Sequence, residues 1–235
     1  YRHTLSSFSQ WPDAPQGAQA IWCGNPNNPT GHVIPKKELV EYIQKHPEQV
    51  FVFDQSYASF SPQEVLSARE AISLGNVILV QSLTKSFAIP GLRLGYLVSN
   101  ATTLEGIRAL SHPWSVNTLA IEAGKWLLRN QALYEGIEAQ LLKSSRTLRA
   151  KLSSFPWLSI VPTDTHFFIF HFEVSGATSA DLKDWLARER GILVRDATNM
   201  GALGSACIRV ASQGEEADQA LVDALRDWYQ QQSSK

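Results

Sequence analysis

Short apolar runs alternate with helical patterns in the first half of the chain, and this alternation constrains the fold more than any other feature. Four runs have the length of buried strands, at residues 20–23, 50–54, 77–81 and 94–98. Apolar residues at helical spacing separate the first of them, at residues 35–45 and 62–73. Strands that alternate with helices predict an α/β layer with a largely parallel sheet.

The second half of the chain predicts a long helical stretch and then a further small α/β unit. Helical spacing covers residues 116–129 and 132–152, and again 179–190 and 215–229. Short apolar runs predict strands at residues 158–161, 167–172, 192–195 and 206–211. We therefore predict a large domain over residues 1–112, connecting helices over 113–154 and a small α/β C-terminal domain over 155–235.

Charge and composition argue against several classes of partner. The formal net charge is −1, which indicates neither a nucleic acid nor an anionic membrane surface as a partner. We expect neither a membrane span nor a secretory leader, because no apolar run has the required length or flanks. Two cysteines in 235 residues, Cys23 and Cys207, favour a reduced, cytoplasmic protein.

Polar and charged residues follow the predicted strands in one order. Asn-Pro-Asn-Asn-Pro-Thr-Gly at residues 25–31 follows the first strand, and Asp-Gln-Ser-Tyr at 54–57 ends the second. Ser-Leu-Thr-Lys at 82–85 follows the third, and Lys85 stands eight residues before Arg93. Because ligands bind beyond the carboxyl ends of strands in such sheets, we expect these motifs to gather at one edge.

These residue types suit a pocket for pyridoxal phosphate. Only an amine condenses with the aldehyde of this cofactor, and Lys85 offers one. An aspartate under the ring, here Asp54, keeps the pyridine nitrogen protonated, so that the ring accepts electrons from a substrate carbanion. The planar donors of Arg93 suit a phosphate. Each residue alone fits a turn, a strand end or a solvated surface, and only their joint order favours the pocket.

The runs at residues 25–31, 54–57, 82–96 and 207–210 together resemble the class I and II aminotransferase superfamily, which has the fold-type I structure and uses pyridoxal phosphate. Within it they resemble the group of histidinol-phosphate aminotransferases and threonine-phosphate decarboxylases. Residues 88–98 and 113–117 look more like the decarboxylase of cobalamin biosynthesis. The resemblance implies decarboxylation of L-threonine O-3-phosphate to aminopropanol phosphate, with transamination of histidinol phosphate or a related amino acid as the alternative.

The resemblance implies a cofactor role for seven residues. Lys85 would form the Schiff base and later shuttle a proton at the substrate Cα. Asp54 would pair with the pyridinium nitrogen. Asn28 and Tyr57 would hydrogen-bond the phenolic oxygen of the cofactor. The cofactor phosphate would be held by Ser82, Thr84 and Arg93.

The resemblance also implies a substrate site in the C-terminal part. Arg209 would bind the α-carboxylate and Arg195 the phosphate of a small phosphorylated amino acid. The alternative for both is an exposed arginine paired with acidic side chains, and Asp196 adjoins Arg195. Three histidines lack metal-ligand spacing, so we expect no metal site and interpret them as structural: His112, His166 and His171.

The chain departs from the family pattern in two places. Gln55 and Ser56 stand where the family has Glu-Ala, and we expect both to be tolerated. The family also has an N-terminal third before the first strand, which supplies a helix N-terminus for the cofactor phosphate, an aromatic that stacks on the ring and a tyrosine for the neighbouring subunit. We therefore interpret the large domain as truncated and expect the chain alone to be a poor enzyme.

Two expectations follow for the protein as a whole. The resemblance implies a homodimer for the full-length form. A hypothesis of a different class is a non-catalytic fragment that keeps the fold without a working site.

Overall fold

A computed structural model describes residues 19–200 and 204–233 of the chain. The chain divides into two compact units. The N-terminal unit comprises residues 19–27 and 32–138, and the C-terminal unit comprises residues 28–31 and 139–233. Among the described residues, no helix combines the length and the apolar character that crossing a membrane requires. The domain boundaries predicted at residues 112 and 154 stay a prediction.

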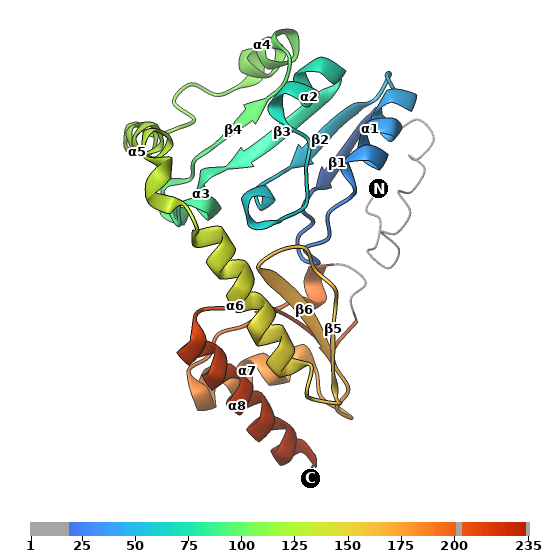
Figure 1. The fold of residues 1–235 in the computed structure, drawn as a ribbon, viewed down its shortest axis with the longest axis vertical. Helices are drawn as coiled ribbons and strands as arrows, with labels where there is room; N and C mark the ends of the chain where they lie inside the picture. The colour runs from blue at the N-terminus through green and yellow to red at the C-terminus, as the bar shows by residue number, and fades with distance from the viewer. Residues whose placement is uncertain (1–18, 201–203, 234–235) are drawn as a thin grey trace. The chain divides into compact units, whose positions relative to one another are not determined.

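The N-terminal unit contains a four-stranded sheet in the order β1-β2-β3-β4 (Figure 1). Its strands are β1 (Ala20–Gly24), β2 (Val50–Asp54), β3 (Val77–Ser82) and β4 (Gly95–Val98). The first three run parallel and β4 runs antiparallel to β3. The prediction of an α/β fold with a largely parallel sheet is thus confirmed.

Helices α1 (Lys36–Lys45) and α2 (Ala68–Leu74) connect the parallel strands. The helix predicted over 62–73 begins later than expected, so that start was wrong. The reason is a capping box, in which the Ser67 hydroxyl accepts from the Glu70 N–H and the Glu70 carboxylate accepts from the Ser67 N–H. This reciprocal pair ends the preceding loop and fixes where the helix starts.

Three short elements and three longer helices lie between β3 and the second sheet along the chain. The one-turn helix α3 (Leu83–Ser86) follows β3 at once, and the 3₁₀ turn η2 (Pro90–Leu92) leads into β4. The remaining elements are α4 (Ala101–Leu110), α5 (Thr118–Arg129), η3 (Gln131–Tyr134) and α6 (Ile137–Leu152). Asn130 caps the C-terminus of α5, which explains the predicted break between the two long helical patterns.

The C-terminal unit contains a second sheet in the order β5-β6-β8-β7, with antiparallel neighbours throughout. Its strands are β5 (Leu158–Ile160), β6 (Phe167–Phe172), β7 (Arg195–Asp196) and β8 (Cys207–Ala211). Phe168 and Phe170 pair with Val210 and Ile208, and these side chains form a core with α6, α7 (Ser179–Arg190) and α8 (Glu215–Ser233). Alternation along β6 therefore sends the neighbouring residues to the opposite face of the sheet.

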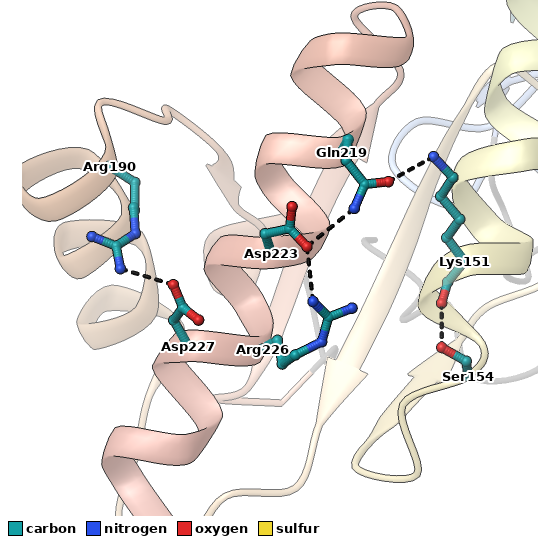
Figure 2. Close-up of polar contacts among 7 residues, drawn as sticks. All are labelled: Lys151, Ser154, Arg190, Gln219, Asp223, Arg226 and Asp227. Atoms are coloured by element: carbon teal, nitrogen blue, oxygen red, sulfur yellow. Dashed lines mark hydrogen bonds and ion pairs between the residues drawn. The ribbon is translucent and has the colours of Figure 1, made fainter.

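Polar contacts tie the solvent side of α8 to the other two helices, as Figure 2 shows. Lys151 of α6 donates to Gln219 at 2.9 Å, and Arg190 of α7 pairs with Asp227 at 2.9 Å. Exposed pairs of this kind contribute at most about 1 kcal/mol each. The buried apolar side chains beneath them, Trp228 among them, therefore dominate the stability of this unit.

Candidate active site

The carboxyl ends of β1, β2 and β3 lie at one edge of the first sheet. Gly24 is the register partner of Asp54, which in turn is the partner of Val80. Two further main-chain bonds extend the ladder past the strand ends, from the Asn25 N–H to the Asp54 carbonyl (2.9 Å) and from the Gln55 N–H to the Val80 carbonyl (2.9 Å). The half-buried Asp54 is thereby held on an ordered backbone at this edge.

Lys85 lies in α3, directly beyond the end of β3. Its Nζ is 5.9 Å from the centre of the Tyr57 ring. The hydroxyls of Ser82 and Thr84, on the same turn, lie 2.7 Å apart. Among the described residues no carboxylate forms an ion pair with the exposed Lys85 amine, which leaves this amine available for a covalent bond.

Arg93 ends the loop between α3 and β4 in a left-handed backbone conformation, with φ 55°. Its Nη1 donates to the Pro90 carbonyl at 2.9 Å. The loop returns to α3 through a bond from the Ile89 N–H to the Thr84 carbonyl (3.2 Å). A positive φ is uncommon for a residue with a side chain and concentrates at functional sites. The eight-residue spacing from Lys85 to Arg93 therefore spans a single loop, which the hydrogen bond from Ile89 to Thr84 holds against α3.

Two sets of hydrogen bonds hold the residues that follow β2, one at the Asp54 carboxylate and one at the Gln55 side chain. One oxygen of the Asp54 carboxylate, Oδ1, accepts from the Ser56 N–H (2.9 Å) and from the Ser56 hydroxyl (2.5 Å). The buried Gln55 side chain donates to the Leu66 carbonyl (2.9 Å) and accepts from Gln81 (2.6 Å). Gln55 and Ser56 were expected to be tolerated departures, and their contacts could not be predicted because only the folded loop brings the partners together.

The donor set in the N-terminal unit fits pyridoxal phosphate group by group. An amine for the aldehyde comes from Lys85, and a carboxylate for the ring nitrogen comes from Asp54. The phenol of Tyr57 suits the phenolic oxygen of the cofactor. Hydroxyl and guanidinium donors suited to a phosphate come from Ser82, Thr84 and Arg93. All six residues lie in one compact unit.

A cavity of about 340 Å³ lies in the same unit. Its lining is rich in hydroxyl groups and aromatic rings and includes Ser59, Ser82, Ser86, Tyr96 and Tyr134. Ser82 is shared with the predicted phosphate site, whereas Lys85, Asp54 and Tyr57 do not line this cavity. The cavity therefore adjoins the predicted phosphate site at Ser82 and is not lined by Lys85.

The C-terminal unit brings the two predicted substrate arginines together. Arg195 on β7 and Arg209 on β8 are cross-strand partners, so their side chains leave the same face of the sheet. Arg209 donates to the Asn28 side-chain oxygen, and its guanidinium lies 5.4 Å from the centre of the Phe167 ring. Like charges directly opposite each other destabilise a sheet. An anion bound between the two guanidinium groups would reduce this repulsion, so this face of the sheet favours anions.

The Asp196 carboxylate does not form an ion pair with Arg195, which was the alternative interpretation of this arginine. Its Oδ1 accepts instead from the Thr198 N–H (2.9 Å) and the Thr198 hydroxyl (2.7 Å). Arg195 is exposed, and its Nη2 donates to the Asn199 side chain at 3.4 Å. This long contact leaves most of the guanidinium donors of Arg195 able to bind an anion.

His166 lies beside Arg209 at the start of β6. Burial, and then the nearby charge of Arg209, lower the pKa of His166 from 6.5 to about 4. The imidazole is therefore neutral at neutral pH and adds no charge to the face with the arginines. Among the described residues, no three His, Cys, Asp or Glu side chains gather in a way that would hold a metal ion.

His166 should make the protein sensitive to acid. Its pKa is lowered by folding, so the unfolded chain binds the proton first, and stability falls as the pH drops from 6.5 towards about 4. We expect the free energy of unfolding in urea to fall less over this range for His166→Asn than for the wild type. His112→Asn, at an exposed histidine of the other unit, is the control, and equal losses for wild type and His166→Asn would contradict the prediction.

The fold identifies the chain as a member of a family of enzymes that depend on pyridoxal phosphate. The sequence matches the family "Aminotransferase class I and II" over residues 9–225, and the chain belongs to this family. The fold is that of the pyridoxal-phosphate aminotransferases: the L-threonine-O-3-phosphate decarboxylase from Porphyromonas gingivalis superposes with a TM-score of 0.87 and 31% identity, over 93% of this chain and 67% of that chain.

Curated relatives of two activities resemble the chain about equally. A histidinol-phosphate aminotransferase of Thermoanaerobacter sp. (strain X514) is 30% identical over 227 residues, which cover 97% of this chain and 62% of the relative. A threonine-phosphate decarboxylase of Salmonella typhimurium (strain LT2) is 31% identical over 206 residues, which cover 86% of this chain and 55% of the relative. The chain thus spans less than two thirds of the length of these relatives.

Proposed function

We propose that the chain belongs to an enzyme that decarboxylates L-threonine O-3-phosphate to aminopropanol phosphate in the cytoplasm. The observation that carries this proposal is the cross-strand pair of Arg195 and Arg209. Two guanidinium groups on one face suit a substrate with two anionic groups, and threonine phosphate carries a carboxylate and a phosphate on adjacent carbons. Histidinol phosphate carries only one anionic group.

We propose the following role for each residue in the reaction. When bound, pyridoxal phosphate supplies an electron sink for the pair of electrons left at the substrate Cα. Lys85 would hold the cofactor through its amine and would hold or return a proton at the substrate Cα. Asp54 keeps the proton on the ring nitrogen, and Tyr57 and Asn28 bind the phenolic oxygen. Arg209 orients the substrate carboxylate.

The orientation of the substrate decides between the two reactions. Arg209 and Arg195 would favour loss of CO₂ if they orient the Cα–carboxylate bond for cleavage, and transamination if they leave the Cα–H bond in that position. Transamination of histidinol phosphate is the second candidate because of the 30% identical aminotransferase.

Side-by-side kinetics test the proposal in the native protein that contains this sequence. We expect CO₂ release from threonine phosphate to be faster than amino transfer from histidinol phosphate to 2-oxoglutarate. A dominant transaminase rate would favour the second candidate. Saturable cofactor binding without turnover of either substrate would favour a non-catalytic protein that keeps the fold.

A homodimer is part of the proposal for the full-length protein. Large apolar side chains are exposed on the N-terminal unit, with exposed fractions of 96% for Trp114, 88% for Leu110 and 76% for Leu119. Exposed apolar surface of this kind marks contacts with other protein surfaces. Sedimentation equilibrium of the native protein measures its oligomeric state, and a monomer at micromolar concentration would contradict the dimer.

A further inference from the structure

We propose that Ser56 is a positioning residue for Asp54, holding one carboxylate oxygen so that the other is presented to the nitrogen of the cofactor ring. The inference rests on the proposed binding of pyridoxal phosphate. Asp54 is the only group assigned to that nitrogen, so a second residue that fixes its carboxylate would affect how well the ring is held and oriented. Ser56 would act entirely through Asp54.

The inference rests on two hydrogen bonds from Ser56 to Asp54. Its N–H and its hydroxyl both donate to Oδ1 of Asp54, at 2.9 Å and 2.5 Å. An O–H···O⁻ distance of about 2.5–2.7 Å is typical of a charge-assisted bond, roughly twice as strong as a neutral one. Two donors on one oxygen resist rotation of the carboxylate and leave Oδ2 as the oxygen for the ring N–H.

The backbone around Ser56 is itself anchored. The Gln55 N–H is bound to the Val80 carbonyl at 2.9 Å, and the Ala58 N–H to the Gln55 carbonyl at 3.0 Å. The buried Gln55 side chain adds bonds to Leu66 and Gln81. Ser56 therefore holds Asp54 from a rigid support, and the carboxylate is preorganised before the cofactor binds.

The hydroxyl is a donor that an alanine at this position would lack. Alanine would offer the N–H bond alone, so the serine supplies one donor more to Oδ1. The same pair of contacts occurs between Thr198 and Asp196, at 2.9 Å and 2.7 Å, so the arrangement is a local backbone motif. We assign it a function only at Asp54, because the cofactor ring would lie there.

The test is a set of equilibrium titrations with pyridoxal phosphate, followed by the absorbance of the bound cofactor. We expect Ser56→Ala to bind about tenfold more weakly than the wild type, as is usual for loss of one hydrogen bond to a charged group. Ser56→Thr keeps the hydroxyl and should bind like the wild type. Thr198→Ala removes the same motif from Asp196 and should leave the affinity unchanged.

A second ligand separates positioning from general support of the fold. An analogue of pyridoxal phosphate with carbon in place of the ring nitrogen has no N–H for Asp54. We expect the wild type and Ser56→Ala to bind this analogue equally well. Equal loss of affinity for both ligands, or no loss for pyridoxal phosphate, would overturn the role of Ser56. A wild type with no saturable binding of pyridoxal phosphate would overturn the proposed cofactor as well, which distinguishes the two failures.

Discussion

Lys85→Ala is expected to abolish covalent capture of pyridoxal phosphate. Lys85 follows β3 at the edge where Asp54 ends β2, and its amine lies 5.9 Å from the Tyr57 ring centre. Borohydride reduction of the loaded wild type, followed by peptide mapping, should place the pyridoxyl group on the peptide that contains Lys85. The variant should carry no label, and its turnover should fall by more than about a thousandfold because the covalent nucleophile is gone.

Two further variants test whether the label depends on the Lys85 amine in particular. Lys85→Arg keeps the positive charge without a condensing amine, so it should also remain unlabelled while still binding the cofactor phosphate. Lys45→Ala removes an exposed lysine at the end of α1 and should label like the wild type. A pyridoxyl group on any lysine other than Lys85 would show that the assignment is wrong.

The strands that carry the N-terminal site could be predicted closely because each is a short apolar run with a polar residue at its end. Residues 50–54 were predicted as a strand and form β2 with the same bounds. The strand predicted at residues 192–195 was displaced, since β7 comprises only Arg195–Asp196. The Ile192 N–H donates to the Leu186 carbonyl near the end of α7. Ile192 and Val194 pack against the hydrophobic core of the C-terminal unit. Their apolar alternation reflects this packing rather than strand pairing.

The family could be predicted from the order of the motifs, but the close contacts of the candidate site could not. Fourteen positions separate Arg195 from Arg209, and this spacing does not reveal that they are register partners, because the register is set only when β7 pairs with β8 in the folded sheet. The bond from Ser56 to Asp54 depends likewise on a side-chain rotamer. The positive φ of Arg93 depends on the loop that returns to Thr84.

The two arginines should differ in which substrates they serve. Arg209→Ala should weaken the use of every amino acid, because Arg209 is proposed to hold the α-carboxylate that all of them share. Arg195→Ala should mainly affect phosphorylated substrates. Loss of one charge-assisted contact of this kind corresponds to about 1.5–3 kcal/mol, or roughly ten- to a hundredfold in kcat/KM.

Matched substrates and a charge control decide the assignment of the two arginines. Threonine phosphate and unphosphorylated threonine should lose activity to a similar extent in Arg209→Ala, whereas only threonine phosphate should lose activity in Arg195→Ala. Arg188→Ala removes an exposed positive charge from α7 and should change neither substrate's kcat/KM. Because Arg195 and Arg209 are cross-strand partners, the double variant should also gain back the stability that their mutual repulsion costs the sheet. Equal losses for both substrates in Arg195→Ala would remove its phosphate role and leave Arg209 as the single anion-binding group.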